Sequence, residues 1–336
     1  MKVLVTGGAG YVGSHAVQEL SAAGHEIVVY DNFSTGHIEF CEGFRVVRGE
    51  IGDRELLSEA LEEVDGVIHF AGSTYVGESM VSPRKYFRNN VEDALQLLDA
   101  VLASDVRIFV FSSSCAVYGI PHRLPIAESS RKEPINPYGA TKLFFEQMLS
   151  AYESSHGLKH VCLRYFNAAG ADKNGNIGEF HHPETHLIPL ALRAVTGTAP
   201  PLRIFGSNLA TPDGTCIRDY IHVSDLGRAH LKAVEYLARG GRSVSLNLGT
   251  GRGTSIVSLV RAIERMVGRS IPREFAASRP GDPPALCADA SLAKVLLDWE
   301  PKFDLTAILE SAWAWEIHGL PALLSASSAT QIVSPL

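Results

Sequence analysis

The sequence predicts an α/β protein built on a Rossmann-type, doubly wound parallel sheet, with a smaller, discontinuous α+β domain for the substrate. Two observations lead to this prediction. Short apolar runs alternate with helical patterns through residues 1–168, as in successive βαβ units. A glycine-rich turn separates the first such run from the first helical pattern, where dinucleotide-binding folds place one. After about residue 169 the alternation loosens, which predicts the second domain.

The expected strands of the parallel sheet are short and mostly apolar, because both faces of such a sheet are buried. They are Lys2–Thr6, Glu26–Tyr30, Arg45–Arg48, Gly66–Phe70, Arg107–Ser112 and Lys159–Tyr165. The helical patterns between them are Gly13–Ala23, Arg54–Leu61, Arg88–Leu102 and Tyr138–Tyr152. Right-handed crossovers would place these helices on both faces of the sheet.

The second half of the chain is expected to contribute to both domains. Two segments, Arg218–Val223 and Val244–Leu248, look like strands that return to the sheet. The helical patterns are Leu187–Thr196, Leu226–Arg239 and Thr254–Gly268, and residues 172–184 are expected to form a loop. We therefore assign residues 1–168 and about 217–250 to a dinucleotide-binding domain, and about 169–216 and 251–320 to a substrate domain. Residues 321–336 lack periodicity and are expected to be a frayed tail.

Composition and charge exclude several classes of protein. The 336 residues include 30 Lys and Arg against 37 Asp and Glu, a formal net charge of −7. That balance argues against nucleic-acid binding. The sequence has neither a run of 18 apolar residues nor an N-terminal apolar stretch long enough for a signal peptide, so we expect no membrane association. Five scattered cysteines without a CxxC spacing indicate reduced thiols in a cytoplasmic protein.

The strongest local motif is the glycine-rich turn Thr6–Gly13. Gly7 would allow a tight turn, Gly10 would let the backbone approach a pyrophosphate, and Gly13 would let the helix pack closely on the sheet. An acid, Asp31, follows Gly13 by 18 residues at the end of the second expected strand. A carboxylate there accepts hydrogen bonds from the adenosine ribose and repels a 2′-phosphate, so the motif favours NAD over NADP.

A second motif, Tyr138-Gly-Ala-Thr-Lys142, has the residue types of a general base. Tyr and Lys four residues apart share one face of a helix. The ammonium would favour the phenolate and so lower the pKa of Tyr138. The run Ser112–Ser114 ends a neighbouring expected strand, on the sheet edge where ligands bind, and could place a hydroxyl beside the phenol.

The remaining polar clusters give weaker signals. His181, His182 and His186 lie in one loop with Glu184, but a metal site needs a further ligand and a fixed scaffold, so we expect no metal. Arg218, Arg279 and Asp282 lie outside the expected dinucleotide half. The two arginines would suit phosphate contacts, although surface solubility explains them equally well.

A longer series of motifs resembles the extended short-chain dehydrogenase/reductase family, over about residues 1–318, and within it the enzymes that epimerise UDP-sugars. The motifs that carry the resemblance are TGGAGYVGSH (6–15), FAG (70–72), VGES (76–79), NNV (89–91), SSSCAVYG (112–119), NPYGATK (136–142), LRYFNAAGA (163–171), THLIP (185–189), DGTCIRDYIHVSDL (213–226), NLGTG (247–251) and RPGDPPAL (279–286). The resemblance implies NAD-dependent 4-epimerisation of a UDP-sugar, by default UDP-glucose or UDP-galactose, through a transient 4-keto sugar. It also implies a homodimer.

The resemblance assigns roles to individual residues. Tyr138 would be the general base, Lys142 would hold the nicotinamide ribose, and Ser114 would bind the reacting 4-oxygen. The implied NAD site comprises Gly7, Gly10, Tyr11, Val12, Gly13, Asp31, Asn32, Glu50, Ile51, Phe70, Ala71, Gly72, Asn89, Ser112, Tyr138, Lys142 and Phe166. The implied UDP-sugar site comprises Ser114, Asn167, His186, Leu187, Phe205, Arg218, Arg279, Asp282 and Leu286, with Leu286 beside the sugar C2 substituent.

Three positions depart from the family pattern, and several functions stay open. Thr74 stands where relatives often carry Lys, Glu50 where Asp is common, and His186 where some have Asn. The sugar could instead be UDP-xylose, UDP-arabinose or an N-acetylhexosamine. The chain could also be a dehydrogenase that releases NADH or a non-catalytic NAD sensor. A 4,6-dehydratase is disfavoured, because Cys115-Ala116 follow Ser114 where that reaction needs an Asp-Glu pair.

Overall fold

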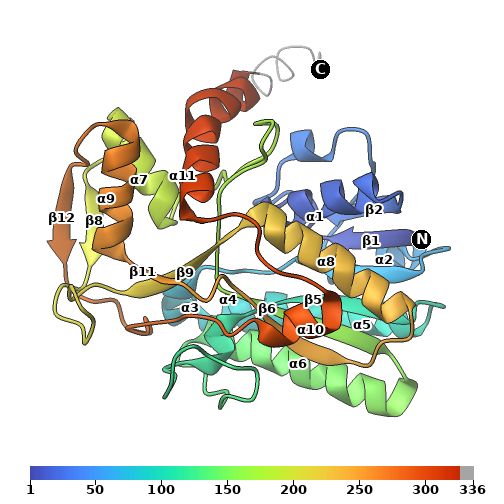
Figure 1. The fold of residues 1–336 in the computed structure, drawn as a ribbon. Helices are drawn as coiled ribbons and strands as arrows, with labels where there is room; N and C mark the ends of the chain where they lie inside the picture. Colours follow the sequence, from blue (N-terminus) through green and yellow to red (C-terminus); the bar gives the residue numbers. More distant parts are fainter. Residues whose placement is uncertain (326–336) are drawn as a thin grey trace.

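The computed structural model describes residues 1–325, whose central feature is a seven-stranded parallel sheet (Figure 1). The strand order is β10-β6-β5-β4-β1-β2-β3. The bounds are β1 Lys2–Thr6, β2 Glu26–Asp31, β3 Arg45–Arg48, β4 Gly66–His69, β5 Ile108–Ser114, β6 Lys159–Tyr165 and β10 Val244–Leu248. The order reverses between β1 and β4, and a doubly wound sheet opens its ligand crevice at the carboxyl ends of the strands beside such a reversal.

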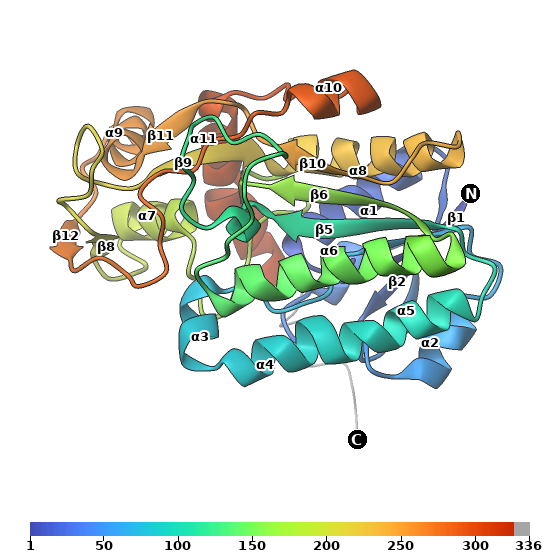
Figure 2. The same ribbon diagram turned by 90° about the horizontal axis from the view of Figure 1, so that it is seen from below.

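Helices cover both faces of this sheet, as the alternating pattern predicts. Helices α2 (Arg54–Ala60), α5 (Ala94–Leu102) and α6 (Pro137–His156) lie on one face, and α1 (Tyr11–Ala22), α8 (Val223–Ala238) and α10 (Ser291–Leu297) lie on the other (Figure 2). Alternate residues of a strand point to opposite faces. Accordingly, Val3 and Val5 belong to the core under α1 and α8, whereas Leu4 belongs to the core under α2 and α5.

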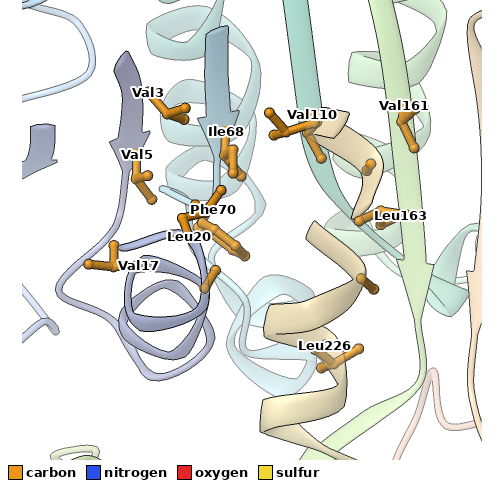
Figure 3. Packing of buried hydrophobic residues seen from close by; sticks show 14 of the residues in the cluster. Val3, Val5, Val17, Leu20, Ile68, Phe70, Val110, Val161, Leu163 and Leu226 are labelled. Atoms are coloured by element: carbon orange, nitrogen blue, oxygen red, sulfur yellow. The ribbon is translucent and has the colours of Figure 1, made fainter. Parts of the chain in front are cut away.

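The core under α1 and α8 is made of interlocking aliphatic side chains. Figure 3 shows side chains from β1, β4, β5 and β6, and Phe70 directly after β4, facing those of α1 and α8: Val3, Val5, Ile68, Phe70, Val110, Val161 and Leu163 against Val17, Leu20 and Leu226. All of these residues are buried. This packing holds the glycine-rich turn, which joins β1 to α1, against the carboxyl end of the sheet.

A smaller unit contains two further sheets. One has the order β11-β9-β7, with β7 Asn167–Ala169, β9 Ile217–His222 and β11 Gly253–Ser255. The other pairs β8 Leu202–Phe205 with β12 Arg273–Ala276. Helices α7 (Leu187–Thr196), α9 (Ile256–Val267) and α11 (Leu305–Ala314) pack on them around a separate apolar core.

The prediction that residues 218–223 return to the main sheet is wrong. Strand β9 pairs with β7 in parallel and with β11 in antiparallel orientation, and only Val244–Leu248 joins the main sheet, where it pairs with β6. An apolar run predicts a strand but not its partner, because the backbone groups that it can pair with are set by the whole fold.

Several element boundaries also differ from the sequence prediction. The expected helix Arg88–Leu102 begins with a π-helical turn over Arg88–Asp93 before α5, and α3 (Val76–Val81) and α4 (Pro83–Phe87) precede it. The fifth strand continues to Ser114, since its last residues pair with β6. The expected helix from Thr254 begins only at Ile256, because residues 253–255 pair with β9. Short 3₁₀ turns at Ile38–Cys41 and Cys115–Tyr118 complete the fold.

The expected tail is partly structured. Residues 320–325 continue helically after a π-helical turn over Trp315–Gly319. Leu323 is buried in a cluster with Phe40, Ile177 and Trp315, so the tail prediction is wrong for residues 321–325. The rest of the predicted tail, 326–336, lies outside the described residues. No helix among the described residues has the length and apolar character that crossing a bilayer requires.

Buried His69, at the end of β4, should make the fold sensitive to acid. The side chain is 2% exposed, its Nδ1 lies 2.7 Å from Thr6 Oγ1, and burial, helped by the charge of Lys142, lowers its pKa to about 3. The unfolded chain would take up this proton below about pH 6.5, whereas the folded chain resists it. Stability should therefore fall by about 2 kcal/mol between pH 7 and pH 5 through this one group.

The measurement is urea unfolding of the wild type and His69→Asn at both pH values. The variant should lose about 2 kcal/mol less on acidification, because its side chain cannot be protonated. His122→Asn, which removes an exposed histidine, is the control and should behave like the wild type. Equal acid sensitivity of the wild type and His69→Asn would contradict the assignment.

Candidate active site

The glycine-rich turn has the close approaches that a dinucleotide-binding turn requires. Gly7 adopts φ +71°, and a Cβ on it would lie 2.5 Å from the backbone nitrogen of Ala71. A Cβ on Gly13 would lie 2.1 Å from the carbonyl oxygen of Gly7. Gly10 caps α1 without a side chain, which leaves the first amides of the helix accessible to an anion. This geometry fits a bound pyrophosphate.

Asp31 lies at the end of β2, beside this turn, with its carboxylate held by backbone amides. Oδ2 accepts a hydrogen bond from the Ala9 nitrogen at 3.0 Å, and Oδ1 accepts one from the Phe33 nitrogen at 2.8 Å. Burial raises the pKa of Asp31, although these hydrogen bonds oppose the shift. The amide of Asn32 donates to Glu50 at 2.9 Å, so Glu50 and Asp31 frame one corner of the crevice. The residues present fit an adenosine ribose with free hydroxyls.

Ser114, Tyr138 and Lys142 converge at the carboxyl end of β5. Ser114 is the last residue of β5, Tyr138 lies in the first turn of α6, and Lys142 lies one turn further along. The Ser114 hydroxyl hydrogen-bonds to the Tyr138 phenol. Lys142 Nζ donates to the Ser112 carbonyl oxygen at 2.8 Å and lies 5.9 Å from the Tyr138 ring centroid. All three side chains are at least nine-tenths buried.

Local sequence explains how α6 presents Tyr138. Asn136 caps the helix by accepting a hydrogen bond from the Gly139 nitrogen at 2.8 Å, and Pro137 occupies the first helical position. A Cβ on Gly139 would lie 2.5 Å from the Ala116 carbonyl oxygen, so glycine lets α6 approach the turn that follows β5. The helix start is therefore fixed one residue before Tyr138.

Burial dominates the pKa shifts of Tyr138 and Lys142. Burial raises the pKa of Tyr138 above its ordinary value of 10, and the hydrogen bond from Ser114 only partly opposes the shift. Burial also lowers the pKa of Lys142 to about 8, against the opposing charge of Glu146. In the chain without NAD, desolvation of the phenolate dominates the pKa of Tyr138, and the expected lowering by Lys142 stays a prediction for the protein with NAD bound.

Other residues of the expected NAD site lie around the crevice, but not all present side chains to it. Asn89 Oδ1 accepts hydrogen bonds from both the backbone nitrogen and the hydroxyl of Ser73, at 2.9 and 3.1 Å. The Phe70 ring packs in the core, 4.4 Å from the His230 ring, so only its backbone can line the crevice. The side chains of Ile51 and Val12 likewise pack against the two cores of the main sheet.

The other expected NAD-site residues lie at the start of α1 or at the carboxyl ends of the main-sheet strands. Tyr11 donates a hydrogen bond to the Gly170 carbonyl oxygen at 2.6 Å and so ties α1 to that unit. Phe166 is buried in a cluster with Cys115 and Leu286. Ser112 lies 2.5 Å from the Tyr165 hydroxyl, oxygen to oxygen. Ala71 and Gly72 follow β4 at the carboxyl edge of the sheet.

Apart from Ser114 and Leu286, the residues expected to bind the UDP-sugar fall into two groups. Arg218 Nη2 lies 2.8 Å from Asp282 Oδ1, and Arg279 stacks on the Phe205 ring with its guanidinium carbon 3.7 Å from the centroid. These four form a basic, aromatic-lined group. Asn167, His186 and Leu187 belong to the second group, since Asn167 begins β7 and His186 directly precedes α7. His186 also contacts Glu179, a buried residue that no sequence pattern had indicated as part of the site.

The structure adds polar residues that pattern reasoning missed. Glu146 lies one turn beyond Lys142, and its carboxylate pairs with Arg164 at 2.5 Å. Asn90 accepts from the Ser73 nitrogen at 2.7 Å and donates to Thr141 Oγ1 at 3.1 Å. Among the additional polar residues near the site, only Asn136 could have been found from the sequence, because Asn followed by Pro is a typical helix start.

The parallel sheet, the glycine-rich turn and the buried Ser–Tyr–Lys group together define a dinucleotide-dependent enzyme class. The model of the NAD dependent epimerase/dehydratase family matches residues 3–249, and the chain belongs to this family. NAD is therefore its cofactor, as the acid at position 31 predicts.

Proteins of known function or solved structure are similar to this chain over nearly their whole length. The chain is 50% identical over 315 residues to the UDP-glucose 4-epimerase of Rhizobium meliloti (strain 1021), covering 93% of this chain and 96% of the relative. It superposes on the UDP-glucose 4-epimerase of Brucella ovis in complex with NAD with a TM-score of 0.90 at 51% identity, covering 93% and 97%. The enzyme of Stenotrophomonas maltophila with bound NAD and formylated UDP-arabinopyranose gives a TM-score of 0.92 at 38% identity, covering 96% and 99%.

Proposed function

We propose that the protein catalyses the NAD-dependent 4-epimerisation of a UDP-sugar and interconverts UDP-glucose and UDP-galactose. The observation that carries this proposal is the convergence of Ser114, Tyr138 and Lys142 beside the glycine-rich turn. The names of the relatives agree with it. A redox cofactor, a base and an anchor for UDP are the parts that such a reaction needs.

In this proposal Tyr138 moves the proton of the sugar 4-hydroxyl. Its phenolate accepts that proton as the 4-keto sugar forms, and the phenol returns it to the opposite epimer. Ser114 hydrogen-bonds the 4-oxygen and the phenol. NAD, when bound, supplies the redox chemistry and a positive charge that favours the phenolate. That charge offsets the burial that otherwise raises the pKa of Tyr138.

The nucleotide end of the substrate would be held while the sugar turns over. Arg218 and Arg279 provide two cations, and the stacked Phe205 provides an apolar face. Guanidinium groups suit bidentate binding of phosphate oxygens. Anchoring at the diphosphate leaves the keto sugar free to present either face, which an epimerase requires and a dehydrogenase does not.

The deciding experiment gives purified protein UDP-galactose without added NAD and follows both UDP-glucose and absorbance from NADH. Conversion to UDP-glucose without net NADH is the expected result. Accumulation of NADH would instead indicate a dehydrogenase, and absence of both products would indicate a non-catalytic NAD-binding protein. Tyr138→Phe protein, prepared in parallel, controls for contaminating enzymes.

We also propose the organisation of the active unit. Residues 1–168 and 217–250 would bind NAD, with β9 lying in the small sheet, and residues 169–216 and 251–320 would bind the UDP-sugar.

A homodimer is supported by Phe87 and Phe144, which are 38% and 44% exposed and pack against each other on α4 and α6. Sedimentation analysis tests it. The five buried free thiols are consistent with a cytoplasmic protein.

Leu286 is expected to decide whether N-acetyl sugars are accepted. Its side chain is 6% exposed and packs with Cys115, the residue after Ser114, and with Phe166. Leu286 leaves more apolar room near the reacting sugar than a Tyr at the same position would. We expect measurable turnover of UDP-N-acetylglucosamine in addition to UDP-glucose, and Leu286→Tyr should suppress the N-acetyl activity more strongly.

The measurement is kcat/KM for both sugars in the wild type and in Leu286→Tyr. One methyl-sized difference in fit is worth only about 1–3 kcal/mol, but steric exclusion by the larger ring costs more. Leu286→Met, which nearly conserves volume, is the control and should retain the wild-type ratio. Equal loss of both activities in Leu286→Tyr would mean that Leu286 is only a packing residue.

A further inference from the structure

Four metal-ligating side chains gather in the loop between β7 and α7. They are Glu179, His181, Glu184 and His186, and one ligand atom from each lies within 4.8 Å of the others. From the sequence, which shows His181, His182, His186 and Glu184 here, we expected no metal, because a site needs a further ligand and a fixed scaffold. The fourth ligand, Glu179, is buried and becomes part of the group only through the course of the loop.

His186 Nδ1 contacts Glu179 Oε1 directly, whereas His181 keeps longer separations from both carboxylates of the cluster, which suit a shared ion better than hydrogen bonds. His181 Nδ1 lies 3.5 Å from Glu179 Oε1 and 3.6 Å from Glu184 Oε1. A 3.6 Å contact is too long for a hydrogen bond. Four ligands about 2.1 Å from a tetrahedral ion are about 3.4 Å apart, close to both separations.

Unpaired buried atoms point to a missing partner. His181 Nδ1 is buried without a hydrogen-bond partner in the described part of the chain, and Glu184 Oε2 has only the Arg193 guanidinium, 3.8 Å away. The Glu184 side chain is only 3% exposed. Buried polar atoms are nearly always paired with protein, water or an ion, so each exception needs an explanation. A bound cation would account for the unpaired His181 Nδ1.

Charge in this region is also unbalanced. Glu179, Glu184 and Glu316 are buried near a single guanidinium, that of Arg193, which lies 2.9 Å from Glu316 and 3.8 Å from Glu184. Without a metal, the charges of Glu179 and Glu184 raise the pKa of His186 to about 9 despite its burial, so its imidazolium supplies part of the positive charge. With both imidazoles neutral, as metal ligands are, two negative charges would remain uncompensated, and burying such charges is costly. A divalent cation carries the compensating charge.

The scaffold that a metal site needs is present. The Trp315 indole donates to the Glu179 carbonyl oxygen at 2.9 Å. Glu184 Oε1 accepts from the backbone nitrogens of Thr185 and His186, at 2.8 and 2.9 Å. The His181 ring packs edge-on against Tyr11 of the glycine-rich turn, with centroids 6.3 Å apart. These contacts fix the backbone on both sides of the cluster.

We propose that Glu179, His181, Glu184 and His186 bind one Zn²⁺ ion. Two imidazoles and two carboxylates suit tetrahedral zinc, and four protein ligands make the site structural rather than catalytic. The ion would tie the start of α7 to the loop packed against Tyr11 and so hold the sugar-side loop beside the cofactor turn. Coordination through Nδ1 leaves Nε2 of His186 available to the substrate. The proposal does not depend on the reaction that the protein catalyses.

The test uses the full chain, treated with a chelator and dialysed. Titration with ZnCl₂ in a calorimeter should show one site per chain. Titration with Co²⁺ should give the strong visible absorption of four-coordinate cobalt rather than the weak absorption of the hydrated ion. His181→Ala and Glu184→Gln should each weaken Zn²⁺ binding at least about tenfold, as loss of a ligand or its partner does.

His182→Ala is the matched control, because His182 is an exposed histidine of the same loop outside the cluster. It should bind Zn²⁺ like the wild type, and Zn²⁺ should raise the melting temperature of both. A wild-type chain that binds no stoichiometric Zn²⁺ or Co²⁺ would overturn the proposal. Equal affinities in His181→Ala, Glu184→Gln and His182→Ala would overturn it as well. If a variant does not fold, the wild-type cobalt spectrum alone decides.

Discussion

Replacing Tyr138 with phenylalanine should lower the rate of UDP-sugar epimerisation by about 10²–10⁴-fold, the usual contribution of a positioned acid–base group. The phenyl ring fills the same buried space between β5 and α6, and Ser114 keeps its backbone position. What disappears is the proton acceptor for the sugar 4-hydroxyl. Steady-state kinetics with UDP-galactose measure the effect.

NAD binding separates this loss from a structural one. Tyr138→Phe should retain NAD and melt within a few degrees of the wild type, because no core contact is removed. Tyr165→Phe is the matched control, since it removes another phenol, one that is partly buried and pairs with Ser112 rather than with the reacting oxygen. A Tyr138→Phe enzyme that keeps more than about a tenth of the wild-type rate would show that another group is the base.

Breaking the buried ion pair behind the active site should have the largest effect on stability. Arg164 and Glu146 are 3% and 7% exposed, and two guanidinium nitrogens contact the carboxylate at 2.8 and 2.5 Å. Ser113 donates to the same carboxylate at 2.6 Å. Arg164→Met leaves Glu146 buried without its counter-ion, so the free energy of unfolding should fall by about 3–5 kcal/mol.

A double variant tests whether the unpaired charge is the cause. Arg164→Met with Glu146→Met removes both charges and should recover most of the loss, because apolar replacements of buried pairs are often neutral or stabilising. Arg203→Met, which breaks an ion pair with about 60% of each side chain exposed, should cost less than about 1 kcal/mol. Denaturant unfolding measures all three. A double variant as unstable as Arg164→Met would contradict the charge explanation.

The main sheet was predictable because each of its strands and helices is encoded by residues that are close together in the chain. The runs Lys2–Thr6, Arg45–Arg48 and Lys159–Tyr165 match β1, β3 and β6 residue for residue. Strands buried on both faces must be continuously apolar, and the helices between them must show a 3.6-residue period. The turn at Gly7 and Gly13 was readable for a similar reason, since only glycine fits where a Cβ would meet backbone.

Short elements escaped prediction because their stability comes from partners. β7 and β11 have three residues each, too few for any periodicity, and exist as strands because β9 lies between them. The segment Ile217–His222 could not be assigned to the correct sheet for the same reason, since its sequence pattern would suit a strand of either sheet. Strand pairing is a property of the assembled backbone, not of the segment.

The sequence by itself determined the doubly wound sheet, the position of the dinucleotide turn and the Tyr138–Lys142 pair, because each depends on residues close together in the chain. Tertiary structure alone decided how the pKa values of that pair shift, since burial raises the pKa of Tyr138 and lowers that of Lys142. It also decided that Glu179 joins His181, Glu184 and His186 and that Arg164 meets Glu146. Desolvation and pairing between distant residues depend on the packed molecule, and no local pattern records them.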